Sequence, residues 1–111
     1  MATVRNLVID QGTSYSITIT VSDANGNALN LNGYTVSGQM RKSYGAISFV
    51  PFTTEINLPS TNGEITISLE PEQTSALRAG RYVYDIEIVD GDNKITRVLE
   101  GIVTITPEVT R

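Results

Sequence analysis

Acidic side chains are the residues of this sequence whose types best suit catalysis. The densest group comprises Asp85, Glu87, Asp90 and Asp92. Two carboxyl groups that face each other across a cleft can perform the acid–base steps of glycoside hydrolysis. Asp85 and Glu87 instead stand two residues apart in a strand pattern, which places both on one outer face, and Asp90 and Asp92 occupy a turn-forming stretch. We therefore predict that the chain has no catalytic residues and is not an enzyme.

Two residue types that serve many enzymes and metal sites do not occur among the 111 residues, since the sequence contains neither histidine nor cysteine. Histidine is the commonest general base and metal ligand, and its absence excludes Ser-His-Asp and Cys-His catalysis. The absence of cysteine excludes a disulfide framework and a thiolate zinc site.

The stretch Asp23–Asn27 begins like a calcium-binding loop, with oxygen-bearing side chains at its first, third and fifth positions. A complete loop also needs glycine at the sixth position and a bidentate glutamate at the twelfth. This chain has Ala28 and Tyr34 there. We predict a hairpin turn in which Asp and Asn side chains bond to the backbone, and we predict no bound metal and no cofactor.

The tyrosines offer aromatic faces on which sugar rings could stack, and they are Tyr15, Tyr34, Tyr44, Tyr82 and Tyr84. Strand alternation already places four of them on inward faces, so a core role explains them. Only Tyr44, in the irregular turn Ser43–Gly45, is expected to be exposed. A small carbohydrate-binding adhesin module therefore stays open as an alternative function.

Alternation of apolar and polar residues predicts the strands that must position these side chains. Residues 14–21 alternate without exception between hydroxyl and large apolar side chains, and residues 64–69 repeat the pattern. Residues 80–106 contain two further runs separated by Asp90–Asn93, whose residues tolerate positive φ. We predict a β-hairpin there.

Weaker patterns predict the remaining strands. Val4–Ile9 is a short apolar run that we expect to form an edge strand. Gly38 interrupts a strand around residues 34–40, where something approaches closely or the strand bulges. From Ser43 to Pro59 the pattern is irregular, and because Pro51 cannot donate to a ladder we predict an edge strand that crosses between two sheets.

One helix and one bulge complete the expected elements. Pro71–Arg78 has proline at the first helical position, and Gly80 lies just past the end, where left-handed geometry is wanted. Gly101 interrupts the last apolar run. We predict a bulge at Gly101 that resets the alternation between residues 95–99 and 103–105.

About seven strands with turn signals every 8 to 12 residues or so are typical of an antiparallel sandwich. The entry to the sixth strand resembles that of immunoglobulin-like domains, with Tyr82 as the corner tyrosine and Tyr84 in place of the usual cysteine. Both cysteines and the core tryptophan of true immunoglobulin domains are absent. We predict an all-β, immunoglobulin-like sandwich with one short helix, formed as a single domain by residues 1–111.

Charge and hydropathy exclude further partners. The net charge is −4, the pI is near 4.6, and the longest basic run is the pair Arg41-Lys42, so the field that attracts a nucleic-acid backbone is missing. No apolar run approaches the roughly 20 residues of a membrane span, and the N-terminus lacks an apolar signal-peptide core. We expect a soluble product of a cytoplasm that binds no nucleic acid, membrane or small-molecule substrate.

Five segments together resemble small structural proteins of tailed bacteriophages: residues 32–41, 63–69, 74–77, 80–86 and 100–111. The order of strand, two-turn helix and Tyr-x-Tyr-Asp strand is also similar to the immunoglobulin-like N-terminal domain of phage baseplate upper proteins. In those proteins a further region follows this domain, whereas the present chain stops soon after its last strand. The resemblance thus favours a stand-alone virion component over a receptor-binding role.

The resemblance implies a non-enzymatic protein–protein attachment module of a virion, in the tail or baseplate, made in the host cytoplasm. A head decoration or cement protein is the alternative location. The implied partners are other virion structural proteins, with a homo-oligomer as a further possibility. The edges at Val4–Ile9 and Ser43–Pro59 are the expected attachment surfaces, since edge strands carry unpaired backbone groups.

Overall fold

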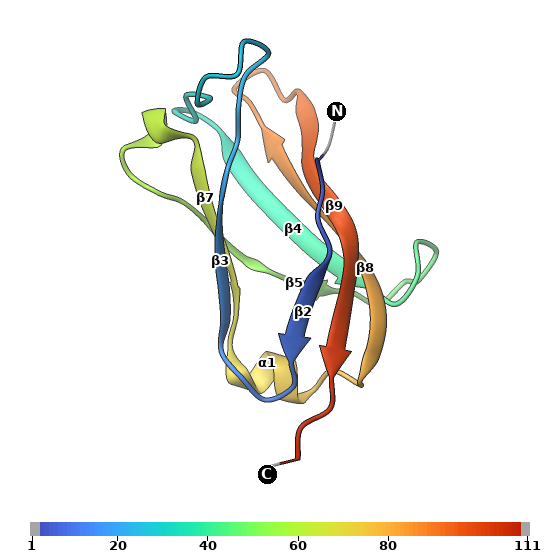
Figure 1. Cartoon of the computed structure of the whole chain (residues 1–111). Coiled ribbons are helices and arrows are strands. Elements are labelled where there is room, and N and C mark those ends of the chain that lie inside the picture. The colour runs from blue at the N-terminus through green and yellow to red at the C-terminus, as the bar shows by residue number, and fades with distance from the viewer. Residues whose placement is uncertain (1–2, 110–111) are drawn as a thin grey trace.

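The computed structural model describes residues 3–109, and these form two β-sheets packed face to face (Figure 1). One short α-helix closes the lower end of the sandwich in that view. The elements in chain order are β1 (Thr3–Val4), β2 (Leu7–Asp10), β3 (Tyr15–Thr20), β4 (Thr35–Arg41), β5 (Val50–Pro51), β6 (Thr53–Ile56), the 3-10 helix η1 (Ser60–Asn62), β7 (Glu64–Leu69), α1 (Pro71–Ser75), β8 (Gly80–Val89) and β9 (Ile95–Thr106).

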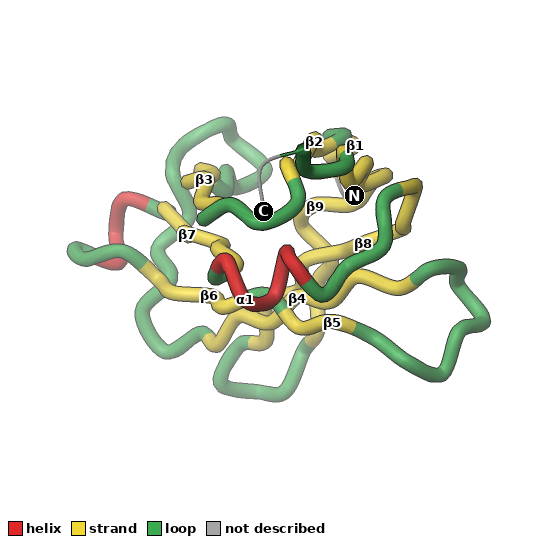
Figure 2. The backbone as a smooth tube through the Cα atoms, turned by 90° about the horizontal axis from the view of Figure 1, so that it is seen from below, coloured by secondary structure: helices red, strands yellow, loops and turns green. Residues whose placement is uncertain are grey.

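The strands divide into a large sheet and a small sheet. The large sheet has the order β1-β9-β8-β4-β5, with β2 also paired to β9, and the small sheet has the order β3-β7-β6. Figure 2 looks along the strands and shows the two sheets side by side. All ladders are antiparallel except that β1 and β2 run parallel to β9.

Apart from the first strand, this strand order matches that of an immunoglobulin-like sandwich. The second, fifth and fourth strands of such domains form one sheet, and the third, sixth and seventh form the other. With β5 and β6 counted as one crossing segment, β3 to β9 follow this division. The first strand, interrupted between β1 and β2, departs from it, because it pairs with β9 in the large sheet and not with the sheet of the second strand. The predicted all-β sandwich of about seven strands with one short helix is confirmed.

The core lies between the two inner faces and is built by the alternation read from the sequence. β7 buries Ile65, Ile67 and Leu69 completely or nearly so, while the residues between them face outward. The inward residues of β8 and β9 meet them from the large sheet. The fully buried large side chains are Ile9, Leu31, Met40, Ile65, Ile67, Leu69, Ile86, Ile105, Val103 and Thr74.

The predicted hairpin of residues 80–106 is confirmed as β8 and β9, but its bulge is elsewhere than predicted. Ile86 pairs with Leu99 and Glu87 with Arg97, so Val98 is the extra residue. Alternation then continues unbroken from Leu99 through Gly101, so the predicted bulge at Gly101 is wrong.

Gly101 is required for a different reason, the close approach of the N-terminal segment. A Cβ atom at Gly101 would lie 2.3 Å from the carbonyl oxygen of Arg5. The N–H of Arg5 donates to the carbonyl of Glu100, and the N–H of Ile102 donates to Oδ1 of Asn6. Gly101 therefore lets the first strand lie directly against β9.

The edge strand predicted at Val4–Ile9 is present, divided into β1 and β2. It pairs with β9 on one side and forms that edge of the large sheet. Arg5 and Asn6 interrupt it. The Asn6 side chain accepts the backbone bond from Ile102 that a regular ladder would give to the main chain.

The irregular segment Ser43–Pro59 crosses between the sheets as predicted. β5 pairs with β4 in the large sheet, and β6 pairs with β7 in the small sheet. Phe52, between these two strands, is buried in the core. The hydroxyl of Thr54 donates to the carbonyl of Val36 at 3.0 Å and ties the crossing to β4.

The helix is shorter than predicted, because α1 ends at Ser75 and not at Arg78. Glu70 and Gln73 form a capping box at its start. Beyond Ser75 the chain must turn Leu77 into the core, where it is 6% exposed. Gly80 is the first residue of β8 and has a φ of 137°. The prediction that Gly80 caps the helix in the left-handed conformation is therefore also wrong.

A tyrosine corner follows the helix, as predicted for Tyr82. Its hydroxyl donates to the carbonyl of Arg78 at 2.9 Å. We expect Tyr82→Phe to lower the free energy of unfolding by about 0.5–1.5 kcal/mol, the net worth of one hydrogen bond. Urea denaturation measures the loss, and Tyr44→Phe is the control because Tyr44 is 85% exposed. Equal midpoints for the Tyr82 variant and the wild type would show that the corner bond contributes nothing.

Candidate functional site

The acidic cluster predicted to be non-catalytic is divided between two places. Asp85 lies on the outer face of the large sheet and pairs with Arg97 at 3.3 Å, and Glu100 pairs with the same guanidinium at 3.1 Å. The hydrogen bond to Glu100 and the charge of Asp85 raise the pKa of Arg97. Asp90 lies in the hairpin turn, where its carboxylate accepts the N–H groups of Asp92 and Lys94 at 2.9 Å each.

The Asp23 stretch is the hairpin-type turn that we predicted. Oδ1 of Asp23 accepts the N–H groups of Asn25 at 2.9 Å and Asn27 at 3.0 Å. The Asp23 carboxylate therefore stabilises the backbone of its own turn. Across residues 3–109, no three acidic side chains are grouped in a way that could hold a metal ion.

The tyrosines divide as predicted, four toward the sandwich and Tyr44 toward solvent. Tyr84 is 4% exposed and its hydroxyl donates to the carbonyl of Arg5 at 2.5 Å. Burial, with a smaller effect of nearby Tyr15, raises the pKa of Tyr84 from 10.0 to about 12, although Arg5 opposes the shift. Tyr84 therefore joins the N-terminal strand to the core.

The raised pKa of Tyr84 predicts a loss of stability in alkali. Stabilisation from the buried neutral hydroxyl is complete below pH 10, the ordinary pKa of a tyrosine, and is lost as the pH rises through about 12, the raised pKa of Tyr84. We expect the free energy of unfolding to fall by about 1–3 kcal/mol over this window. Urea denaturation at both ends of the window, for the wild type and Tyr84→Phe, measures it. A variant that loses as much stability as the wild type would contradict the assignment to Tyr84.

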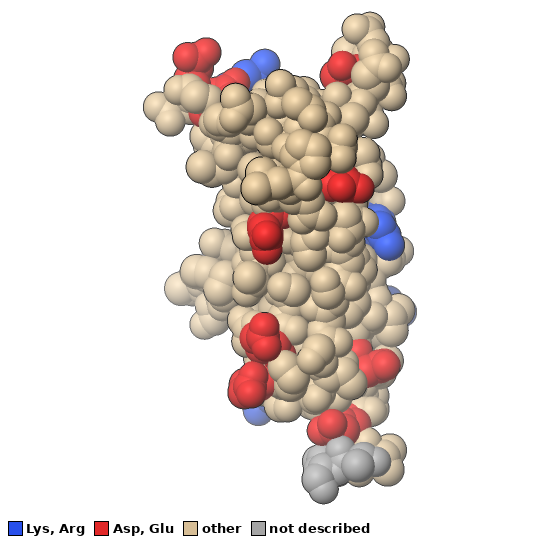
Figure 3. Space-filling view, turned by 90° about the vertical axis from the view of Figure 1, so that its left-hand side faces the viewer, with Lys and Arg blue, Asp and Glu red and all other residues tan. Residues whose placement is uncertain are grey.

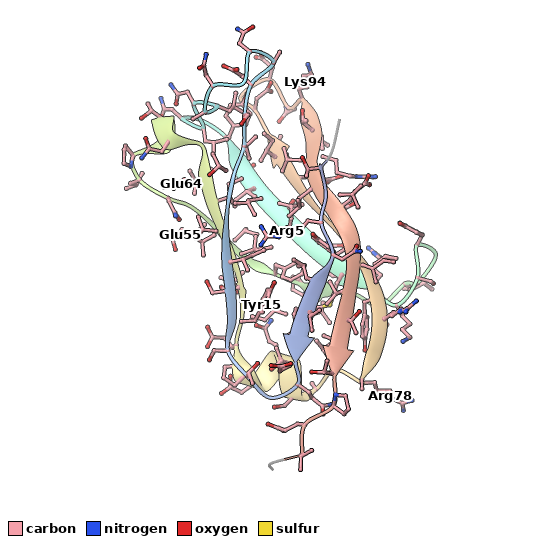
Figure 4. The ribbon with its side chains drawn as sticks, in the orientation of Figure 1. Arg5, Tyr15, Glu55, Glu64, Arg78 and Lys94 are labelled. Carbon is pink, nitrogen blue, oxygen red and sulfur yellow. The ribbon has the colours of Figure 1, made fainter. Side chains whose placement is uncertain are left out.

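The free edge of β3 borders an opening between the two sheets. The N–H of Val21 donates to Gly63 beside β7, so by alternation the backbone groups of Ser16, Thr18 and Thr20 face away from β7. The opening measures about 500 Å³. Arg5 and Lys94 line it, and the Arg5 side chain extends from the N-terminal segment toward β3 (Figure 4).

The outer face of the small sheet is rich in hydroxyl groups. Thr18 and Thr66 share a hydrogen bond at 3.0 Å across β3 and β7, and Thr66 donates to Asn57 at 2.9 Å. Figure 3 looks at this side of the molecule and shows a mostly uncharged surface with scattered acidic side chains. Glu55 and Glu64 belong to this sheet (Figure 4).

The connection Lys42–Phe49 between β4 and β5 projects from the sandwich, and we call it the arm (Figures 1 and 2). Arg41 holds it from its base. The Arg41 guanidinium donates to the carbonyls of Ala46 and Ile47 and lies 5.0 Å from the centre of the Phe49 ring. The arm is thus an ordered hairpin loop in spite of its exposure.

The arm presents apolar side chains to solvent. Tyr44 is 85% exposed, Ile47 93% and Phe49 46%. Between the arm and the outer face of β8 and β9 is a hollow of about 340 Å³ that is lined by Tyr44, Val83 and charged side chains. Large side chains at this degree of exposure mark contact surfaces when they are grouped.

A second apolar group lies at the other edge of the large sheet, and we call it the edge patch. It consists of Val4 and Val8, which are 69% and 64% exposed, and Ile102, which is 40% exposed. The register of β1 and β2 on β9 places all three on one outer face.

Among residues 3–109 there is no helix long and apolar enough to cross a membrane.

No model of a protein family and no curated protein matches the chain.

The sequence predicted both surfaces as segments, since all of the arm except Lys42 lies within Ser43–Pro59, and Val4 and Val8 of the edge patch lie within Val4–Ile9. It did not predict Ile102 as part of the patch, because Ile102 belongs to a different strand. Nor did it predict the free edge of β3. The uninterrupted alternation of apolar and polar residues in β3 does not indicate that β3 pairs with β7 alone.

Proposed function

We propose that the protein is a non-enzymatic structural component of a bacteriophage virion, most consistent with the tail or baseplate, and acts as a protein–protein attachment module. The resemblance of five segments to small phage structural proteins supports this function. The observation that carries it is the placement of exposed apolar side chains at both edges of a well-packed sandwich. Such side chains are costly to expose to water and mark sites where another protein binds.

Attachment would use the edges as well as the side chains. β2 and β3 each have a partner strand on one side only, and a strand of a neighbouring protein can complete such an edge by backbone hydrogen bonds. The outer face of the small sheet adds hydroxyl groups that can bond to a partner. The same surfaces would serve a head decoration protein, which remains the alternative location.

A carbohydrate-binding module is the second candidate, and one observation favours it. Tyr44 borders the hollow on the large sheet together with Asp85, Glu87 and Glu100. An exposed aromatic ring can stack on a sugar ring, and nearby carboxylates can accept hydrogen bonds from the sugar hydroxyl groups. Binding to a glycan array that is lost in Tyr44→Ala would favour this candidate. An array with no bound glycan would count against it.

Mass spectrometry of purified particles tests the structural function. We expect the polypeptide in virions washed free of lysate, at a copy number comparable to that of known tail components. Dissociated tails and heads, analysed separately, would distinguish the tail or baseplate from head decoration. The proposal is wrong if the polypeptide is made during infection but is missing from washed virions.

A further inference from the structure

We propose that the free edge of β3 binds an extended peptide segment of another polypeptide, which adds to the small sheet as an antiparallel strand and fills the opening beside it. The segment has apolar side chains at alternate positions, polar side chains between them, and a carboxylate at its C-terminal end. This inference deepens the proposed attachment function by naming the chemistry of the partner, and it rests on that function only for its biological setting. Four features of the described residues carry it.

The first feature is the open place beside β3. In immunoglobulin domains of the constant type the first strand lies next to the second strand, in the same sheet. Here the first strand pairs with β9 instead, so β7 is the one partner of β3 among the strands of residues 3–109. The backbone groups of Thr18 and Thr20 face the open side, where a further strand can bond to them.

The second feature is that this edge is unprotected. Edge strands of natural sheets are commonly guarded by charged residues, proline or a bulge. β5 contains Pro51 and β6 contains Glu55. The first strand is interrupted at Arg5 and Asn6. Residues 13–22, in contrast, contain no charged residue, no proline and no glycine, and the β3–β7 ladder has no register shift. The edge of β3 is therefore suited to pairing with another strand.

The third feature is the opening of about 500 Å³ beside β3. Core side chains that are at most 9% exposed line it, namely Ile19, Val21, Ile88 and Leu99. A strand added to β3 would turn every second side chain toward the large sheet. Apolar side chains at those positions would enter the opening and lose their contact with water.

This opening distinguishes a separate peptide segment from the β3 strand of a second copy. Two copies could pair their β3 edges, but the inward side chains Ile17 and Ile19 of the second copy are already packed in its own sandwich. The openings of both copies would then stay unfilled. An extended segment that belongs to no sandwich has its inward side chains available, so the opening favours that kind of partner.

The fourth feature is the charge around the opening, which is lined by Arg5, Lys94, Arg97 and Asp90. Arg97 is already paired with one carboxylate of β8 and one of β9. Oδ1 of Asp90 accepts two N–H groups of its own turn. Arg5 forms no ion pair with any residue from 3 to 109, and its side chain extends toward β3 (Figure 4). A carboxylate of the partner beside Arg5 would therefore complement the charge there.

A synthetic peptide with the sequence Lys-Val-Thr-Val-Thr-Glu, blocked at both ends, is the probe. In the antiparallel register that places its valines opposite Val21 and Ile19, its threonines lie opposite Thr20 and Thr18, and its glutamate lies at the Arg5 end of the opening. The lysine keeps the peptide soluble. We expect saturable binding in an NMR titration of the isotope-labelled full chain, with the amides of Thr18 and Thr20 gaining protection from hydrogen exchange. Absence of binding at millimolar peptide would overturn the inference.

Methylation of the peptide backbone tells strand addition from adhesion to an apolar surface. In the antiparallel ladder the threonine N–H groups of the peptide bond to β3, and the valine N–H groups face away. Methylation of both threonine amides should lower the affinity at least about tenfold, whereas methylation of both valine amides should leave it unchanged. Equal effects of the two modifications would contradict pairing with β3. This comparison uses the wild-type chain and needs no variant to fold.

A proline at the edge tests the same pairing from the protein side. The N–H of Thr18 faces away from β7, so Thr18→Pro keeps the β3–β7 ladder and should lower the affinity about tenfold. Val8→Pro is the matched control, because the N–H of Val8 faces away from β9 at the other edge and Val8 does not line the opening. Far-UV circular dichroism confirms that each sandwich is intact. If both variants bind the peptide equally well, β3 is not the site.

Arg5→Gln tests the selection of a carboxylate. This variant should bind the peptide about two- to fivefold more weakly than the wild type does. A peptide with glutamine in place of glutamate should bind the two proteins equally. If the substitution at Arg5 affects both peptides alike, the guanidinium does not recognise the carboxylate and this part of the inference is wrong.

Other outcomes separate this inference from its rivals and from the proposed function. A chain that sediments as a dimer by itself, and as a monomer after Thr18→Pro, would assign the edge to a second copy and overturn the inference. A protein that binds no peptide but is found in washed virions would refute strand addition and leave the attachment function standing. A protein that binds the peptide at β3 but is missing from virions would show the reverse.

Discussion

Gly101→Ala is expected to lower the free energy of unfolding by about 2–4 kcal/mol, which combines overpacking with the loss of hydrogen bonds. The new Cβ would lie 2.3 Å from the carbonyl oxygen and 2.9 Å from the carbonyl carbon of Arg5. These are backbone atoms, so no side-chain rotation relieves the clash. The N-terminal segment must move away, and the bonds from Arg5 to Glu100 and from Tyr84 to Arg5 weaken.

Gly91→Ala is the control, because no atom outside its chain neighbours lies within 4 Å of the Cβ position at Gly91. Urea denaturation gives the two free energies. Hydrogen exchange locates the damage, since the amides of Leu7–Asp10 should lose protection before those of β7. If Gly101→Ala and Gly91→Ala have the same denaturation midpoint, Arg5 does not depend on the absence of a side chain at residue 101.

Strands with strict alternation were the part of the fold that the sequence could predict. In β3, β7 and β8 every second side chain faces the core, so local pattern and tertiary packing agree. The turns at Asp23 and Asp90 were equally predictable. Their geometry is made by bonds between residues at most four apart.

Features that depend on contacts distant in sequence could not be predicted. Gly101 and Arg5 are brought together only by the parallel pairing of the first and last strands, so a glycine in an apolar run was interpreted as a bulge. The helix ends early because Leu77 is needed in the core and Arg78 accepts the bond of Tyr82. Neither demand is visible in local propensities.

The candidate surfaces also combine features that the local sequence predicts with features that depend on contacts distant in sequence. The irregular composition of Ser43–Pro59 marked it as an exposed edge, and Tyr44 was correctly expected in solvent. That Arg41 orders the arm was not predictable, because its three contacts lie on a loop whose shape the sequence does not specify. The edge patch required the register of β1 and β2 on β9.

Ile86→Ala is expected to destabilise the protein by about 2–5 kcal/mol, the range for truncating a buried isoleucine. Ile86 is 0% exposed and pairs with Gly38 on β4. Its Cδ1 atom occupies the space in front of Gly38, 2.3 Å from where a Cβ of residue 38 would lie. Since Gly38 has no side chain to fill the cavity, the site cannot readily collapse, and the loss should lie in the upper part of the range. Ile95→Ala, on the exposed start of β9, is the control and should cost less than about 0.5 kcal/mol.

A second substitution tests the reason for this loss. Gly38→Ala alone should destabilise the protein by about 1–3 kcal/mol, because its methyl group meets Ile86. In the Ile86→Ala background the same methyl group enters the cavity, where the tightest remaining contact is 3.2 Å to the carbonyl of Asp85. The double variant should therefore be more stable than the sum of the two single losses by about 1 kcal/mol or more. Urea denaturation of the four proteins completes the cycle, and strictly additive losses would show that Ile86 and Gly38 do not share this space.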